Sequence, residues 1–163
     1  MSGKHWRMAR SLGATRELGL LGEINRAAPN RVRAADGGIG DAAHAARASD
    51  HNPCKCHRVV CARDFTHDPR NGFDAHAFAE WLRRRVLETE HSESRVKYVI
   101  WHRRIFSGRG QSHPAGVWRP YTGRNPHTTH IHVSVRHPPA LFDDPRDWGW
   151  PPTLEVTRPR EVP

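Results

Sequence analysis

The segment from His127 to Val135 combines histidines with the alternation expected of a β-strand. Successive side chains of a strand point to opposite faces. One face would be apolar and would carry Ile131, Val133 and Val135. The other face would carry His130, His132 and Ser134. Imidazole is the commonest side-chain metal ligand in proteins, so this second face predicts half of a metal site. Polar side chains on a half-exposed strand would give the same pattern.

A second set of candidate ligands lies earlier in the chain. His51 stands within the segment 49–53, and Asp64 follows the apolar run that begins at Val59. A carboxylate at the edge of a buried strand needs a partner, which is either a metal ion or one of the many arginines. With His132, these residues supply two imidazoles and one carboxylate. Three protein ligands with a fourth position left to water are typical of catalytic zinc sites.

The order of these motifs resembles that of the LAS metallopeptidases. This group is named after lysostaphin-type enzymes, D-alanyl-D-alanine metallopeptidases and the sonic hedgehog fold. Ser-x-His at 49–51, an aspartate at 64 and His-x-His at 130–132 follow one another, and the resemblance spans about 44–135. Within the group, the chain is most similar to the D-alanyl-D-alanine carboxypeptidase and L-alanyl-D-glutamate endopeptidase family, which includes bacteriophage endolysins of similar size.

The resemblance implies a single small α+β domain with an antiparallel sheet and flanking helices that line a zinc cleft. It implies that His51, Asp64 and His132 bind Zn²⁺. The implied activity is hydrolysis of an amide bond in the peptide stem of bacterial peptidoglycan, by an endopeptidase or carboxypeptidase of a phage endolysin or autolysin. The alternatives are a metal-dependent nuclease and a catalytically inactive zinc-binding module of the same fold.

Two departures from the family pattern bear on the site. The gap between the first two ligands is longer than the common spacing, and His57 lies closer to that spacing. We prefer His51 because its Ser-x-His context matches, and we retain His57 as the rival ligand. Thr129 stands where many relatives carry a general-base carboxylate. We therefore expect His127 and His130 to be catalytic, with the roles of base and oxyanion stabiliser left open between them.

Further candidates lie around these motifs. A loop as long as 108–123 in a compact domain is usually functional. The candidate substrate contacts are Ser49, Arg104, Tyr121 and Asn125. An arginine can hold a substrate carboxylate by a bidentate hydrogen bond, and Arg103 offers the same chemistry as Arg104. A second, structural metal could be held by Cys54, Cys56, Cys61 and His57. Two loop thiols and one buried cysteine would give the same pattern.

Regular elements must position these residues, and hydrophobic periodicity predicts where they lie. Helices are expected over 8–26, 42–48 and 74–89, the last one capped by Asp74. Strands are expected over 59–65, 96–101 and 130–135. Residues 103–107 either continue the second of these strands or pair back against it as a hairpin.

Composition limits the class of protein. The 163 residues predict one domain, 1–150, with a Pro-rich and mobile tail, 151–163. Lys and Arg number 26 against 17 Asp and Glu, and all but three of the 26 are arginines. The resulting charge of +9 favours an anionic partner, here the cell wall. Nucleic acid is the less favoured partner because the sequence has neither a nucleic-acid-binding motif nor a second acidic cluster.

The sequence also carries expectations about location. No apolar run reaches the ~20 residues that a membrane span needs. Residues 1–21 lack the continuous apolar stretch of a Sec export signal. We therefore expect a monomer that is made in the cytoplasm and, by analogy with the resembling family, reaches the cell wall after holin-type release.

Overall fold

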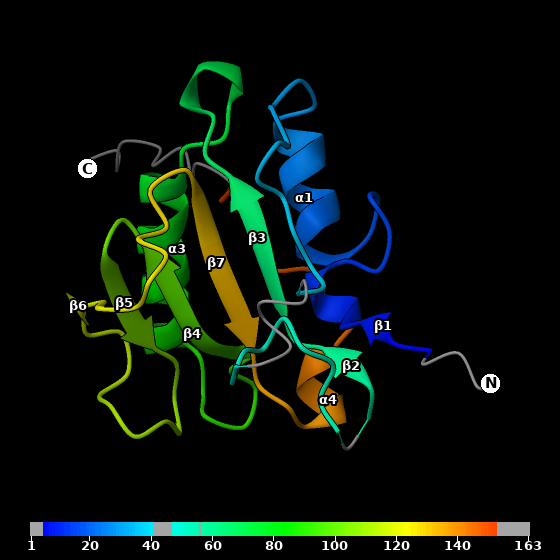
Figure 1. The fold of residues 1–163 in the computed structure, drawn as a ribbon, viewed down its shortest axis with the longest axis vertical. Coiled ribbons are helices and arrows are strands. Elements are labelled where there is room, and N and C mark those ends of the chain that lie inside the picture. The colour runs from blue at the N-terminus through cyan, green and yellow to red at the C-terminus, as the bar shows by residue number, and fades with distance from the viewer. Residues whose placement is uncertain (1–4, 41–46, 56, 153–163) are drawn as a thin grey trace, which may run out of the picture.

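A five-stranded antiparallel sheet forms the centre of the protein (Figure 1). The computed structural model describes residues 5–40, 47–55 and 57–152. The strand order is β3-β7-β4-β5-β6. The strands are β3 Ala62–Thr66, β4 Val96–Trp101, β5 Arg104–Ser107, β6 Arg119–Pro120 and β7 His130–Val135. A separate parallel pair joins β1 Arg7–Met8 to β2 Val59–Val60. This arrangement confirms the predicted small α+β fold.

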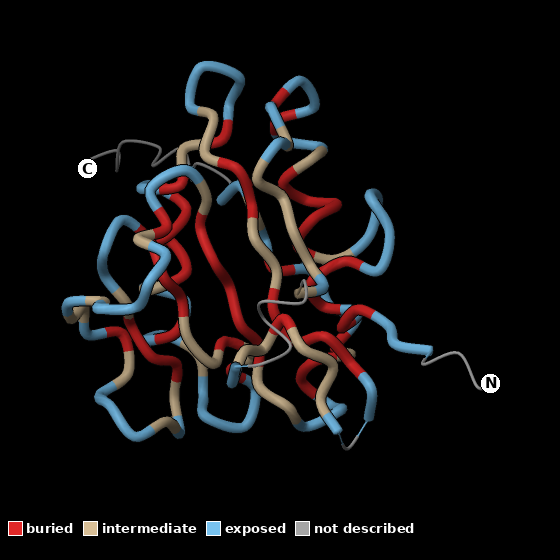
Figure 2. Tube along the Cα trace, in the orientation of Figure 1, coloured by how far each residue is buried: buried red, intermediate tan, exposed pale blue. Residues whose placement is uncertain are grey.

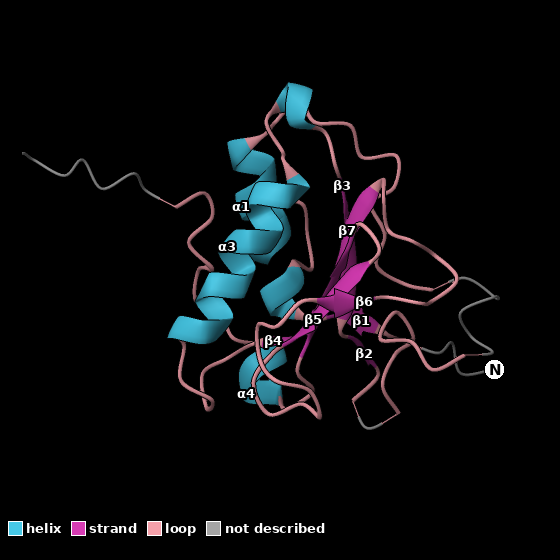
Figure 3. Ribbon diagram, turned by 90° about the vertical axis from the view of Figure 1, so that its left-hand side faces the viewer, coloured by secondary structure: helices cyan, strands magenta, loops and turns pink. Residues whose placement is uncertain are grey.

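Helices cover one face of the sheet (Figure 3). They are α1 Gly19–Ala27, α3 Ala75–Glu88 and the single-turn α4 Pro139–Phe142, with 3-10 turns η1 Arg10–Leu12 and η2 Pro69–Asn71. Helix α3 begins after Asp74, whose carboxylate accepts a hydrogen bond from the backbone N–H of His76. That is the N-cap predicted for this helix. No helix among the described residues has both the length and the apolar character needed to cross a membrane.

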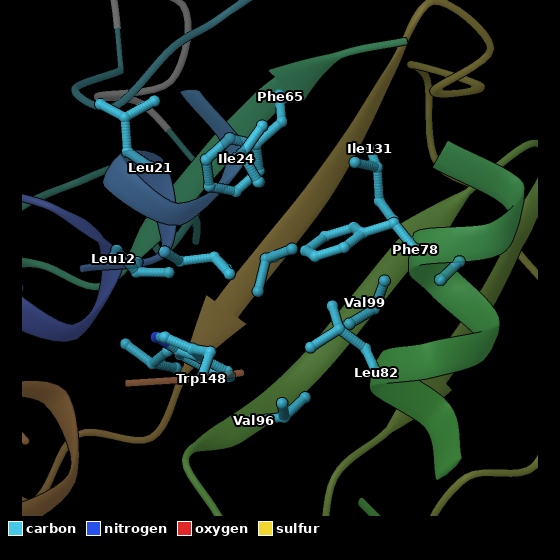
Figure 4. Close-up of a cluster of buried hydrophobic side chains, with 14 of the residues drawn as sticks. Leu12, Leu21, Ile24, Phe65, Phe78, Leu82, Val96, Val99, Ile131 and Trp148 are labelled. Atoms are coloured by element: carbon cyan, nitrogen blue, oxygen red, sulfur yellow. The ribbon is translucent and has the colours of Figure 1, made fainter. Parts of the chain in front are cut away.

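Strand β7 lies in the middle of the sheet and is paired with β3 on one side and β4 on the other. It is buried along most of its length (Figure 2). Its apolar residues point towards the helices, where Ile131 lies beside Phe78 of α3 (Figure 4). Side chains alternate along a strand, so His132 and Ser134 lie on the opposite face, away from the helices. The predicted division of this strand into an apolar and a polar face is confirmed.

The helix predicted over 8–26 is wrong in its first half. Residues 10–12 form a short 3-10 turn, and α1 begins only at Gly19. Gly13 and Gly19 have φ angles of 104° and 58°, and a Cβ at either position would lie 2.5 Å from a backbone oxygen. Only glycine adopts this conformation without strain, so the two glycines hold a tight turn where the periodicity predicts a helix. Leu18 is consequently exposed.

Two further predictions are refined by the structure. The strand predicted over 59–65 is divided at Cys61 into β2 and β3, which belong to different sheets. Residues 104–107 form a hairpin with β4 through the turn His102-Arg103, where both residues have positive φ angles. The helix predicted over 42–48 lies mostly outside the described residues, as do residues 153–163 of the predicted tail.

The last described segment of the chain, which contains Trp148 and Trp150, is hydrogen-bonded to α1. Glu23 of α1 is only 4% exposed. Its two carboxylate oxygens accept hydrogen bonds from the backbone N–H groups of Trp148, at 2.6 Å, and Trp150, at 2.7 Å. The indole N–H of Trp148 donates to the backbone oxygen of Ser11. These contacts join the chain after β7 to the N-terminal helix.

Candidate metal centre

Three side chains from distant parts of the chain meet on the face of the sheet opposite the helices. Asp64 on β3 and His132 on β7 are directly opposite one another in the strand register. The loop before β2 brings His51 to them. His51 Nε2 lies 3.0 Å from His132 Nδ1 and 3.3 Å from Asp64 Oδ1, and His132 Nδ1 lies 3.0 Å from Asp64 Oδ1. The structure thus brings together the three residues that the sequence analysis grouped as zinc ligands.

We call His51, Asp64 and His132 the trio. A hydrogen bond on the outer side of each imidazole fixes which of its ring nitrogens faces the other two residues of the trio. His51 Nδ1 bonds to the carbonyl oxygen of Gly38. Because a carbonyl oxygen only accepts, the proton lies on Nδ1 and the lone pair on Nε2. His132 Nε2 lies 3.0 Å from the hydroxyl of Ser134, which is hydrogen-bonded to the carboxylate of Asp50. The hydroxyl donates to Asp50 and accepts from His132 Nε2–H, so His132 Nδ1 also presents a lone pair.

The trio therefore directs two nitrogen lone pairs and a carboxylate oxygen at one point. Such groups repel one another at about 3 Å unless a positive charge lies between them. Ligand atoms at the usual distances of about 2.0–2.1 Å from zinc stand about 3.4 Å apart at the corners of a tetrahedron. The separations of 3.0–3.3 Å in the trio are close to this value. Donor types, tautomers and spacing all fit a zinc ion.

The pKa values of Asp64 and His51 indicate the same demand for positive charge. Burial opposes ionisation of Asp64, but His132 and His51 outweigh it, because each can hydrogen-bond to the carboxylate when its facing nitrogen is protonated, and this holds the pKa of Asp64 well below its usual range. Burial lowers the pKa of His51, and the hydrogen bond to Asp64 outweighs this and raises the pKa above its ordinary value. The carboxylate is thus ionised and draws a proton or a cation to the trio.

Asp50 is the centre of a polar network behind His132. Its carboxylate accepts hydrogen bonds from Lys97 Nζ at 2.8 and 2.9 Å and from His137 Nε2 at 3.1 Å, in addition to that from Ser134. Burial would raise the pKa of Asp50, but the hydrogen bond from Lys97 lowers it. Outer contacts of this kind orient a metal-binding imidazole and increase its basicity. Lys97 occupies the irregularity in the pairing of β4 with β7, between Val96 and Tyr98.

His127 lies beside the trio at the end of the loop before β7. Its ring Nδ1 donates to the backbone oxygen of Asn125 at 2.7 Å, and its backbone N–H donates to Asn125 Oδ1 at 3.0 Å. The backbone of His127 has a φ of 51°, a conformation that non-glycine residues adopt only when their surroundings hold them in it. The Nε2 lone pair of His127 is thereby left available. Burial and the nearby His132 lower the pKa of His127 to about 4.

His130 flanks Asp64 on β7. Its Nδ1 lies 3.1 Å from the hydroxyl of Thr129. Its Nε2 lies 3.7 Å from Asp64 Oδ2, is buried, and has no hydrogen-bond partner among the described residues. Burial lowers the pKa of His130 below its ordinary value. Both histidines that the sequence analysis expected to be catalytic thus lie against the carboxylate of the trio, as neutral imidazoles.

A pocket opens over the trio. Its floor is made by residues of β3, β4 and β7, and its walls are the segments before His51 and before His127. The lining residues are Arg47, Ala48, Ser49, His51, Asp64, Tyr98, Ile100, Tyr121, Arg124, Asn125, His127 and His132. Polar groups that converge beside an apolar patch are typical of a ligand-binding pocket.

The predicted substrate residues divide into two groups. Ser49, Tyr121 and Asn125 line the pocket. Ser49 also accepts a hydrogen bond from the backbone N–H of His51, and Asn125 holds His127, so both position the histidines. Arg104 does not line the pocket, because its guanidinium lies over the ring of Trp118, 4.6 Å from the ring centroid. Among the predicted substrate residues, Arg104 is therefore the one that the structure places elsewhere.

The rival ligand is not part of the trio. His57, the rival ligand, is exposed and packs edge-on against Phe142. Cys56, a member of the proposed second metal set with Cys54, Cys61 and His57, lies outside the described residues.

Sequence reasoning did not assign several residues of the site. Asp50 and Ser134 stand within the motifs that supply His51 and His132, so their proximity in sequence was a usable signal. Tyr98 lies two positions before Ile100 on β4, and strand alternation puts both on one face. Arg47 and Arg124, in contrast, reach the pocket from loops and have no periodic pattern that could identify them.

Comparison with protein-family models gives a match over much of the chain. The family model described as "VldE, C-terminal domain" matches residues 23–132, which is more than half of the chain. The matched range contains all three residues of the trio as well as His127 and His130. No curated protein and no solved structure matches the chain.

Proposed function

The chain belongs to the VldE C-terminal domain family, and we propose that it is a zinc metallopeptidase that hydrolyses amide bonds in the peptide stem of bacterial peptidoglycan. The convergence of His51, Asp64 and His132 beneath an accessible pocket carries this proposal. Their tautomers leave three donor atoms directed at one point, which suits three protein ligands and one open position. Structural zinc sites use four protein ligands instead, so this donor set favours catalysis.

The substrate class comes from the resemblance to the LAS metallopeptidases. Ser-x-His, the strand aspartate and His-x-His follow in the same order, and their side chains meet on an antiparallel sheet. The stem peptide and the wall polymers around it carry negative charge. Arg47 and Arg124 at the pocket and the net charge of +9 suit such a substrate. A phage endolysin or autolysin that acts at the cell wall is the role consistent with these features.

His127 is the proposed proton carrier. When bound, zinc supplies Lewis-acid polarisation of the scissile carbonyl and a water that ionises near neutral pH. Asn125 holds the Nδ1–H of His127, so its Nε2 is free to accept a proton from a water in the pocket. The same nitrogen then delivers that proton to the amine of the leaving group. His130 does not line the pocket and lies 3.7 Å from Asp64 Oδ2, so it is less suited than His127 to exchange a proton with a molecule in the pocket.

Digestion of purified peptidoglycan tests the proposal, with mass spectrometry of the released muropeptides. We expect cleavage of a stem amide bond that a chelator abolishes and zinc restores. His132→Ala should lose both zinc and activity. His127→Ala should keep zinc and lose about two to four orders of magnitude in rate. His113→Ala, in an exposed loop, is the control and should behave as the wild type.

Two results would overturn the proposal. Chelator-sensitive cleavage of DNA without cleavage of peptidoglycan would identify a metal-dependent nuclease. Full zinc loading with cleavage of neither substrate would identify a zinc-binding module without activity, in keeping with Thr129 in place of a carboxylate.

A further inference from the structure

We propose that Asp64, His127 and His130 form a second binding site for zinc or a similar divalent transition metal, which shares the carboxylate of Asp64 with the first site. Metal binding there is independent of the proposed function. Only its consequence for activity, given below, rests on that function.

The donor atoms of the second set converge. One oxygen of Asp64 and one nitrogen from each of His127 and His130 lie within 4.8 Å of one another. The residues come from β3, from β7 and from the loop that leads into β7. Two neutral imidazoles and a carboxylate are again a donor set that suits zinc.

The two oxygens of Asp64 face different partners. Oδ1 lies 3.0 Å from His132 and 3.3 Å from His51. Oδ2 lies 3.7 Å from His130 Nε2. A carboxylate whose two oxygens face different imidazoles can bridge two metal ions.

The unpartnered nitrogen of His130 is a further observation that supports the second metal site. His130 Nε2 is buried without a hydrogen-bond partner among the described residues, and buried polar atoms are normally paired. A metal ion between this nitrogen and Asp64 Oδ2 would satisfy it. His127 is already arranged for such a role, because the Nδ1–H bond to Asn125 leaves its Nε2 lone pair available.

The spacing predicts that the second site is the weaker one. Its His130 Nε2 and Asp64 Oδ2 atoms lie 3.7 Å apart, compared with separations of 3.0–3.3 Å in the first set. Side chains must therefore move before they can bind one ion together, and this movement reduces the affinity. A metal ion in the second site would occupy Nε2 of His127, the proposed proton carrier. Zinc in excess over one equivalent should accordingly inhibit the enzyme.

Metal titration of the chelator-treated full chain tests the site without any substrate. Co²⁺ absorption and isothermal calorimetry with Zn²⁺ should each resolve a tight phase and a weaker phase in the wild type. His130→Gln and His127→Gln should each lose the weaker phase and keep the tight one, which also shows that the variant is folded. His132→Ala should lose the tight phase. The control His113→Ala, which removes an exposed histidine, should keep both phases.

The outcomes separate this inference from the proposed function. A single phase in the wild type, or a weaker phase that survives in both glutamine variants, overturns the second site even if the enzyme cleaves peptidoglycan. Two phases with the expected losses support the site even if peptidoglycan is not cleaved. In an active wild type, hydrolysis that rises to one equivalent of zinc and falls beyond it supports the inhibitory consequence, and a flat response up to saturation of the weaker phase overturns it.

Discussion

Replacement of Glu23 by Gln should lower the free energy of unfolding by about 2–3 kcal/mol. Glu23 is 4% exposed, and its carboxylate accepts one backbone N–H with each oxygen, from Trp148 and Trp150. A glutamine keeps one acceptor and turns the other into an NH₂ group that faces an N–H. One hydrogen bond to a charged acceptor is worth roughly 1.5–3 kcal/mol, and a buried donor left unpaired costs about as much. The lost hydrogen bond and the unpaired donor are two descriptions of the same change, so their energies are not added.

Urea unfolding followed by far-UV circular dichroism, at a fixed zinc concentration, measures this change. The midpoint of thermal unfolding should fall by about 4–12 °C in parallel. Glu88→Gln is the matched control, because Glu88 is exposed on α3 and the substitution removes the same charge. It should change stability by no more than about 0.5 kcal/mol. A Glu23→Gln protein that unfolds within that margin of the wild type would refute the proposed anchoring of the segment 148–150.

Two further changes test the outer contacts of the site and the acid sensitivity of the fold. Ser134→Ala removes the acceptor for His132 Nε2–H, so zinc affinity in competition with a chromophoric chelator should fall about 10- to 100-fold. Ser107→Ala, equally buried on β5, should leave it unchanged. The hydrogen bond from Arg146 lowers the pKa of Asp144, so its stabilisation is complete above its unfolded pKa of about 3.9 and is lost as pH falls through the lower folded value. Urea titrations should show a shallower loss of stability below about pH 4 in Asp144→Asn than in the wild type.

The parts of the fold that could be predicted from the sequence are those with a local cause. The alternation along residues 130–135 follows from strand geometry, and the start of α3 follows from the cap at Asp74. The first half of the helix predicted over 8–26 failed because Gly13 and Gly19 adopt left-handed conformations that an apolar pattern does not reveal. Local periodicity describes what a segment favours, and not where the chain must turn.

The residues of the candidate site also divide into those that the sequence could identify and those that depend on the folded chain. His51, Asp64 and His132 could be grouped because motif order and residue type point to zinc. The role of Asn125 could not be predicted, because it depends on a positive φ angle at His127 that brings its ring back over the loop. Asp50 reaches Ser134 and Lys97 only through the pairing of β4 with β7, which is not encoded within any one segment. The position of Arg104 over Trp118 is likewise a product of tertiary packing.

The central position of β7 has a consequence for synthesis of the protein on the ribosome. β3 pairs only with β7 within the five-stranded sheet, although more than 60 residues separate Thr66 from His130 in the chain. Until residues 130–135 emerge, β3 has no sheet partner, and His51 and Asp64 lack His132, the third member of the trio. Contacts between such distant segments form late, because the chain between them must first be ordered. A nascent chain that has not reached β7 should therefore neither protect its sheet from proteolysis nor retain zinc, so we expect the proposed metal ion to bind only after most of the domain has been translated.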